Sequence, residues 1–384
     1  MGRILSRFSR VTSSGKWLAE IDGLRFIAII SVVLTHIMSD TVTRVLAVSE
    51  LDRALVTLLH KGEVGVQIFF AISGFILALP FVEACFQGAC APRLGEYYRR
   101  RVYRIEPPYV ISMVVLTAIA LLAGGLDRID RLPHLLASLF YVHNVVYDAW
   151  SGINFVAWSL EVEVQFYLIA PLLATVFALH SRSLRITLIV AGMIACGLAA
   201  TWVEPMSFRV RTMLPFQLQY FLAGFLLAEV FVNDWRGKPT KAWYWTVIAV
   251  LGWVGVFLVG DWPSFQSVLA CLIFVAFFAS MRSSAVSSFL ANRWISTIGG
   301  MCYSIYLWHF WFYAAYARPT AFEGGFARVL LINCLLGIPV VLVGSAVFFL
   351  LFEKTFMRRD WPSAMRKKFD RIVAWREYRL SSRA

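Results

Sequence analysis

Two glutamates stand in an apolar stretch, WSLEVEVQFYLIAPLL (residues 158–173), that otherwise suits the interior of a membrane. A carboxylate at that depth costs about 2–4 kcal/mol on insertion scales, so a function or a bonded partner must offset the cost. Positions two apart on a helix point about 200° away from each other, so Glu161 and Glu163 cannot both face one site. Glu163 shares a helical face with Ser159 and Tyr167. We therefore predict that one glutamate serves a site and the other has a supporting role.

Two histidines lie in other apolar stretches, His36 in IDGLRFIAIISVVLTH and His309 in YSIYLWH. His36 follows Arg25 by eleven positions, which at about 1.5 Å per residue places it roughly 16 Å farther along one helix. Each histidine alone can equally well be a packing or interfacial residue. Together with the glutamates they form a set of intramembrane ionisable groups in one half of the bilayer, and such groups are candidates for function.

A basic cluster, RRRVYR (residues 99–104), precedes the third apolar stretch. These arginines can simply set the topology of the chain. Their guanidinium groups also match the oxygens of phosphate, so the cluster is a candidate anion site at the membrane face farthest from the histidines.

The composition decides which kind of protein must position these residues. Of 384 residues 59% are hydrophobic and 15% charged, and the mean hydropathy is +0.69. Soluble chains carry about 25% charged residues, so we predict an all-α polytopic membrane protein. The net charge of +13 would suggest nucleic acid in a soluble protein. Here the basic residues occupy short loops and the tail, where they contact membrane lipids, and we expect no nucleic-acid partner.

A span needs about 20 apolar residues. Placing the N-terminus inside leaves most lysines and arginines in cytoplasmic segments, so we predict that both termini are cytoplasmic. We divide the chain into a basic N-terminus (1–18), a membrane domain (19–352) and a basic tail (353–384), and expect an interfacial or re-entrant helix at 132–143. About ten spans are expected, at 19–38, 64–82, 106–125, 154–179, 185–202, 213–232, 243–260, 263–280, 294–316 and 327–352.

Five motifs, in this order, make the chain resemble the acyltransferase 3 family of integral membrane proteins, which O-acylate bacterial cell-surface sugars and lipid-linked glycans. The first motif holds Arg25 and His36 in the family's spacing, and GVQIFFAISGFIL (65–77) contains its Ser-Gly-Phe segment. The paired arginines, the Trp-Ser-Leu motif with its invariable acid at Glu163, and YSIYLWH complete the set. The family residues in these motifs are Arg25, His36, Ser73, Arg101, Arg104, Glu163 and His309.

The resemblance implies transfer of an acyl group, with acetyl expected, from cytoplasmic acyl-CoA to a hydroxyl of an extracytoplasmic or lipid-linked glycan. It implies a location in the bacterial inner (plasma) membrane. Arg25, Arg101 and Arg104 would bind the phosphates and arm of the donor. His36 would act as general base with Glu163 orienting its imidazole, although an acyl-His36 intermediate stays open. Ser73, Tyr167, His309 and Glu161 are assigned to substrate binding, and no metal is expected because the histidines lack ligand spacing.

A rival interpretation is a transporter or flippase for a glycolipid or small anion, since carriers also place charges inside the membrane. Against it stands the lack of a visible inverted repeat or of paired Gly/Pro-broken helices. A non-catalytic assembly subunit would leave the layered ionisable groups unexplained. Many relatives carry an esterase-like domain after the last helix, and we expect whatever that domain adds to be either absent here or supplied by a partner.

Overall fold

The computed structural model describes residues 17–45, 48–123, 131–203, 207–235, 238–260, 262–318 and 324–358, together with residues 8, 10, 361–363 and 370–371. Within these ranges the chain is helical and forms no strand, apart from one isolated bridge between Thr240 and Ser283. The α-helices are α2 Ala19–Arg44, α3 Glu50–His60, α4 Gly65–Phe86, α5 Leu94–Ala123, α6 Arg131–Leu139, α7 His143–Tyr147, α8 Trp158–Leu173, α9 Arg182–Val203, α10 Phe208–Arg211, α11 Leu218–Val230, α12 Trp243–Val259, α13 Gln266–Arg282, α14 Ser284–Leu290, α15 Arg293–Gly300, α16 Cys302–Ala317, α17 Phe326–Ile332, α18 Ile338–Phe348 and α19 Lys354–Phe356.

Six helical segments of the described chain are long and apolar enough to cross a membrane. They are Ala19–Arg44, Glu50–Phe86, Leu94–Leu122, Phe155–Ala178, Arg182–Trp202 and Phe326–Phe356, and α12 and α13 are shorter apolar helices. The chain is therefore a multi-pass membrane protein, and six of the ten expected spans meet both criteria. The remaining expected spans fall on shorter helices, and the direction of insertion stays a prediction. Of the predicted tail (353–384), the structure describes residues 353–358, 361–363 and 370–371, and the rest lies outside the described residues.

The segment 132–143 is helical as expected, mostly as α6 with α7 beginning at its end, and its interfacial or re-entrant placement stays a prediction. The helix before α4 was not predicted. Glu50–His60 continues through the 3₁₀ segment η1 (Lys61–Val64) into α4. Ser49 and Asp52 form a capping box at its start, which supplies partners for the first backbone N–H groups. The segment has no buried residue. The sequence does not predict this helix, because its short mixture of polar and apolar residues gives no membrane-length signal.

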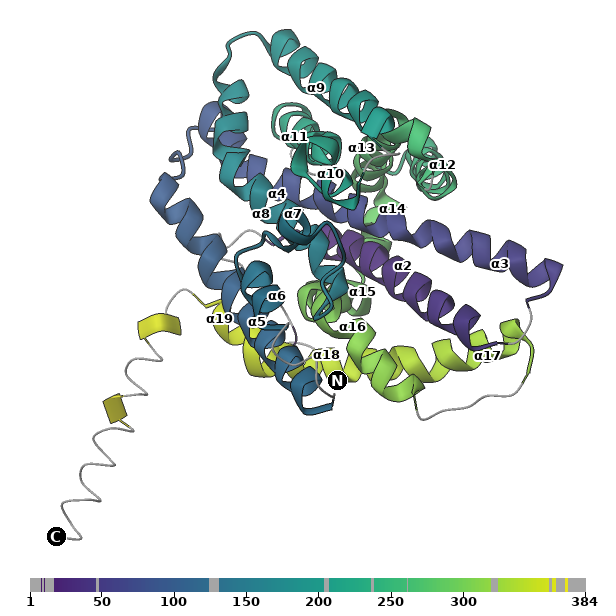
Figure 1. The fold of residues 1–384 in the computed structure, drawn as a ribbon. Coiled ribbons are helices and arrows are strands. Elements are labelled where there is room, and N and C mark those ends of the chain that lie inside the picture. Colours follow the sequence, from purple (N-terminus) through teal and green to yellow (C-terminus); the bar gives the residue numbers. More distant parts are fainter. Residues whose placement is uncertain are drawn as a thin grey trace, which may run out of the picture.

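The long helices α2 and α4 run through the middle of the molecule (Figure 1). The helices α9, α11, α12 and α13 lie on one side of them, and α15, α16 and α18 lie on the other. The helix α5 lies at the edge, beside α6 and α19. Residues on α2, α4, α8, α11 and α13 contribute to the largest apolar core.

Close helix contacts fix the positions of two site segments. A Cβ on Gly74 would lie 2.1 Å from the carbonyl oxygen of Phe221, so only glycine lets α4 approach α11 this closely next to Ser73. A Cβ on Gly299 would lie 1.7 Å from the carbonyl oxygen of Asp22, which presses α15 against the start of α2. The chain then turns at Met301, so the expected span 294–316 is in fact two helices, α15 and α16.

Candidate active site

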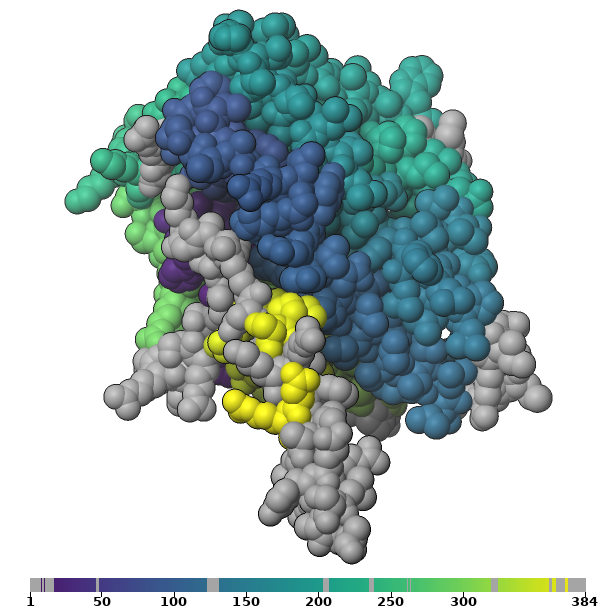
Figure 2. All heavy atoms as spheres, turned by 90° about the vertical axis from the view of Figure 1, so that its left-hand side faces the viewer, coloured from purple at the N-terminus to yellow at the C-terminus, as the bar shows by residue number. Residues whose placement is uncertain are grey.

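A cavity of about 660 Å³ opens between the start of α2, the end of α4 and the start of α5. We call it the arginine vestibule, because six arginines and only three carboxylates line it. Figure 2 looks onto this side of the molecule and shows purple atoms near the start of α2 in a recess beside the blue α4 and α5 segments. The charged lining residues are Arg10, Arg25, Arg93, Arg100, Arg101 and Arg104 with Asp22, Glu83 and Glu96.

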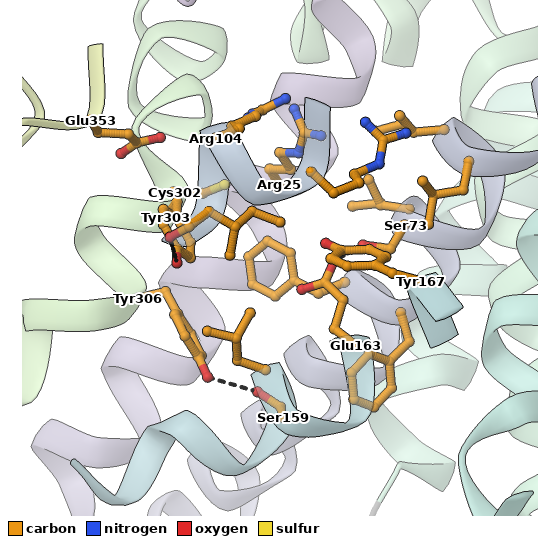
Figure 3. Close-up of a pocket in the computed structure, with 18 of the residues that line it drawn as sticks. Arg25, Ser73, Arg104, Ser159, Glu163, Tyr167, Cys302, Tyr303, Tyr306 and Glu353 are labelled. Carbon is orange, nitrogen blue, oxygen red and sulfur yellow. Dashed lines mark hydrogen bonds between the residues drawn. The ribbon is translucent and has the colours of Figure 1, made fainter. Parts of the chain in front are cut away.

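A smaller inner chamber, about 140 Å³, shares Arg10, Arg25, Arg101 and Arg104 with the vestibule as wall residues. Figure 3 shows Arg25 and Arg104 at one end of this chamber and the Ser159–Tyr306 pair at the other. The two cavities therefore adjoin at the arginines, and the chamber leads from them into the membrane domain. Its remaining polar lining residues are Ser73, Ser159, Glu163, Tyr167, Cys302, Tyr303, Tyr306 and Glu353.

The arginines differ in whether the protein already pairs them. Arg25 donates to the buried carboxylate of Asp22 at 2.5 Å, and Arg100 Nε donates to Glu96 at 3.0 Å. Among the described residues, Arg101 and Arg104 form no ion pair, and Arg101 Nε is buried without a hydrogen-bond partner. Arg101 lies over the ring of Tyr97, which leaves its charge without a counter-ion in contact, so Arg101 and Arg104 are the groups suited to an anionic ligand.

Asp22, which the sequence did not single out, organises the other arginines. Its carboxylate accepts from Trp17 Nε1 at 2.7 Å and from Arg10 at 3.3 Å, besides the bond from Arg25. The side chain is 2% exposed, and these three donors compensate for its burial. Its only sequence signal was its place in the first motif, three residues before Arg25.

The Ser-Gly-Phe segment and the Trp-Ser-Leu motif meet across the chamber. Ser73 on α4 donates a hydrogen bond to Glu163 on α8. Ser159, Glu163 and Tyr167 all line the chamber, as expected for positions four residues apart on one helix. Glu163 thus lies in the chamber with the arginines, where its carboxylate can accept a hydrogen bond from a ligand.

Glu161 faces the opposite way and does not line the chamber. Its buried carboxylate accepts from the backbone N–H of Asn144 at 3.0 Å, which ties α8 to α7. The neighbouring residue His143 is hydrogen-bonded to His134 at 2.8 Å between ring nitrogens. Burial, with the nearby His134, lowers the pKa of His143 to about 4, so this ring is neutral at ordinary pH. The contacts of Glu161 are those of a residue that supports the fold.

The two site histidines contact each other, although 273 positions separate them. His36 Nδ1 lies 2.7 Å from His309 Nε2, and the rings are nearly parallel, with an interplanar angle of 6°. His309 Nδ1 faces two carbonyl oxygens, Ile305 at 3.0 Å and Tyr306 at 2.9 Å. Carbonyl oxygens only accept, so His309 Nδ1 carries a proton and, in the neutral ring, Nε2 presents a lone pair.

This arrangement fixes the tautomer of His36. Because His309 Nε2 accepts, His36 Nδ1 must carry the proton of the neutral ring, and His36 Nε2 is left with a lone pair. His36 as a whole residue is partly exposed. The expected hydrogen bond between Glu163 and His36 is not made among the described residues. His309 occupies the orienting position that the sequence assigned to Glu163.

Tyr306, which sequence reasoning missed, stands between the chamber and the histidine pair. Its hydroxyl donates to the carbonyl oxygen of Val156 and therefore accepts from Ser159, whose oxygen lies 3.1 Å away. Its backbone carbonyl accepts from His309. Tyr306 thus links the wall of the chamber to His309 along α16, while neither site histidine lines the chamber itself. The sequence offered a weak signal, the position of Tyr306 inside the YSIYLWH motif.

Glu353 is a second lining acid that was assigned only to the start of the tail. It is 1% exposed and accepts from Ser304 through the backbone N–H at 3.0 Å and the hydroxyl at 2.5 Å.

In the described part of the chain no group of three His, Cys, Asp or Glu side chains is arranged to hold a metal ion.

The geometry can now be set beside known proteins. A family model described as an acyltransferase domain matches residues 18–353. The chain belongs to the acyltransferase 3 family. It is 26% identical over 324 residues to the O-acetyltransferase OatA of Staphylococcus aureus (strain NCTC 8325 / PS 47), covering 77% of this chain and 51% of the relative. It is 24% identical over 329 residues to the putative O-acetyltransferase SACOL0978 of Staphylococcus aureus (strain COL), covering 77% and 50%.

The chain therefore spans about half the length of the curated relatives it matches. No solved structure matches it. All five motifs lie within the region that the family model matches, and the structure gathers them around the chamber and the histidine pair.

Proposed function

We propose that this protein is a membrane O-acyltransferase that moves an acyl group, with acetyl preferred, from cytoplasmic acyl-CoA to a hydroxyl of an extracytoplasmic or lipid-linked glycan. Family membership and relatives named O-acetyltransferases support the reaction class. The observation that carries the proposal is the arginine vestibule, which adjoins a chamber lined by Glu163 and by Tyr306, three residues before His309 on α16.

The donor fits the charges of the two cavities. Coenzyme A carries several phosphate charges, which suit Arg101 and Arg104 at the junction of vestibule and chamber. Its pantetheine arm is long and thin, and two amide N–H groups along it can donate to the carboxylate of Glu163. The thioester at the end of the arm then points toward Tyr306 and the histidine pair.

The reaction needs a base at that end. His36 Nε2 would take the proton of the acceptor hydroxyl as its oxygen attacks the acyl carbon. The C–S bond breaks, the coenzyme A sulfur leaves as a thiolate, and the proton passes from His36 to that sulfur. His309 would keep the base in the correct tautomer and stabilise the imidazolium through the hydrogen bond from His36 Nδ1. The Ser159–Tyr306 contact must open for the thioester to reach His36 Nε2.

The test is an assay of purified full-length protein with radiolabelled acetyl-CoA and a panel of soluble oligosaccharides. We expect label on a sugar hydroxyl and stoichiometric release of free coenzyme A. Uptake of an anion or glycolipid into vesicles, without labelled product and without any need for acetyl-CoA, would instead support the transporter interpretation.

A further inference from the structure

An exposed tryptophan stands on the loop between α7 and α8, at the histidine end of the molecule. Trp150 is 53% exposed, although its neighbours in the loop are firmly held. Ser151 and Asn154 are 5% and 1% exposed, and Asn154 donates to the carbonyl oxygen of Leu307 at 3.1 Å. The loop is thus anchored on α16 while it presents a large aromatic ring to the outside.

The ring of Trp150 has a fixed aromatic support. Phe208 on α10 lies against it, with ring centroids 4.3 Å apart, and Trp158 makes an edge contact at 6.0 Å. The residue next to Phe208, Arg209, donates its backbone N–H to the carboxylate of Asp148 at 2.5 Å. Trp150 and Asp148 are therefore held against neighbouring residues of α10, Phe208 and Arg209, and α10 lies beside α7 in Figure 1.

This aromatic group is continuous with the proposed base. Phe155 contacts Trp150, with centroids 6.4 Å apart, and its ring lies edge-on to His36 at 5.2 Å. Phe310 also contacts Phe155, at 4.7 Å. Because Phe155 contacts both rings, the centroids of Trp150 and His36 can be no farther apart than the sum of these two centroid distances. That sum is about the length of a disaccharide.

We propose that Trp150, supported by Phe208 and flanked by the carboxylate of Asp148, is a binding subsite for a pyranose ring of the acceptor glycan. A pyranose has an apolar face of C–H groups that can pack on an indole ring, and hydroxyls around its rim that can donate to a carboxylate. A glycan seated on Trp150 would present a hydroxyl of an adjoining sugar to His36. The subsite rests on the proposed function and names the place where its acceptor binds.

The competing explanation is that Trp150 only anchors the protein at the membrane interface, where tryptophan is common. Trp262, in the turn between α12 and α13, provides a matched control. It is 51% exposed and has an aromatic companion, Phe265, at 5.3 Å. Its ring makes no contact with His36 or Phe155 among the described residues.

The experiment measures transfer from saturating acetyl-CoA to increasing concentrations of oligosaccharides built from N-acetylglucosamine, glucose or mannose. Purified full-length protein is compared with Trp150→Ala, Trp150→Phe and Trp262→Ala. We expect Trp150→Ala to raise the acceptor KM about tenfold, equivalent to about 1.4 kcal/mol, with kcat and the acetyl-CoA KM unchanged. Trp150→Phe should retain part of the affinity, and Trp262→Ala should match the unsubstituted protein. Equal effects of Trp150→Ala and Trp262→Ala would overturn the proposal.

Calorimetry measures the binding of the same oligosaccharides without acetyl-CoA, so it tests the subsite independently of the reaction. Binding that Trp150→Ala weakens, in a protein that transfers no acyl group, would uphold the subsite and refute the proposed function. If no oligosaccharide of the panel binds to the unsubstituted protein, the subsite is refuted. Equal elution of all variants from a sizing column and equal affinity for acetyl-CoA exclude misfolding as the cause of a loss.

Discussion

At the scale of single residues, the arrangement of the two histidines gives the clearest chemical assignment. The carbonyl oxygens of Ile305 and Tyr306 fix the proton of His309, and His309 in turn fixes the proton of His36. An acid usually holds a catalytic histidine in this way, and here a second histidine takes its place. We therefore propose His309 as a positioning residue that would act on the reaction through His36.

The first prediction concerns that position. His309→Ala should lower kcat at least tenfold, with the acetyl-CoA KM unchanged, because His36 loses the partner that holds its tautomer. His309→Gln should recover part of kcat, since an amide oxygen can accept from His36 Nδ1. Steady-state kinetics of both variants, beside an inactive His36→Ala, test this. Equal loss from the alanine and glutamine variants would show that the hydrogen bond to His36 is not what matters.

The second prediction is that substitutions of Glu161 and Glu163 affect transfer and thermal stability differently. Glu163→Gln should abolish or severely reduce transfer, because the amide keeps a single accepting oxygen, which Ser73 already occupies, and its NH2 group cannot accept from a ligand. Glu161→Gln should be milder for transfer and should lower the Tm instead, since its carboxylate holds the backbone of Asn144. Activity and thermal unfolding are measured on both. An equal loss of activity from the two substitutions contradicts the assignment of roles.

The third prediction concerns Arg101 and Arg104, which form no ion pair among the described residues, and it uses a donor that lacks the nucleotide. Arg101→Ala and Arg104→Ala should raise the KM for acetyl-CoA at least tenfold but leave the KM for S-acetylpantetheine nearly unchanged, because only the former carries phosphates. Arg99→Ala is the matched control, since Arg99 lies on the same helix but does not line the vestibule. A similar rise for both donors, or a similar effect of Arg99→Ala, would argue against phosphate binding at Arg101 and Arg104.

At the scale of helices, close packing between α4 and α11 positions Ser73 toward Glu163. Gly74→Ala would place a methyl group 2.1 Å from the carbonyl oxygen of Phe221 and must push the helices apart. We expect a Tm several degrees lower and a loss of activity. Gly95→Ala, at a site with no atom within 4 Å of the new Cβ, should leave both unchanged or raise the Tm slightly. An unaltered Tm in Gly74→Ala would refute the claim that the close packing of α4 against α11 at Gly74 positions Ser73.

The same scale shows what could be predicted from the sequence. Helical periodicity separated the faces of Glu161 and Glu163, and the structure agrees, because rotation about one helix is a local property. The partner of His36 could not be deduced in this way. His36 and His309 meet because α2 and α16 cross at that level, and the crossing depends on side-chain packing along both helices. The face of a helix on which a residue lies was predictable, but contact between helices was not.

At the scale of the whole molecule, the candidate site has two separate parts, the arginine vestibule and the histidine pair. The arginine vestibule lies at the start of α2 and the histidine pair lies farther along the same helix, as the spacing of Arg25 and His36 predicted. Asp22, Tyr306 and Glu353 escaped prediction because each acquires its role only when distant segments assemble around one cavity. We infer that acyl-CoA and glycan approach from opposite membrane faces, so that only the acyl group crosses.

A sided assay in sealed proteoliposomes tests this central claim most directly. Acetyl-CoA is enclosed in the lumen and an impermeant acceptor oligosaccharide is supplied outside, and the labelled product is compared with that of vesicles given both substrates outside only. The account predicts product when the bilayer separates the two substrates and none when both are on one side. Product formed only when donor and acceptor share a side would contradict it.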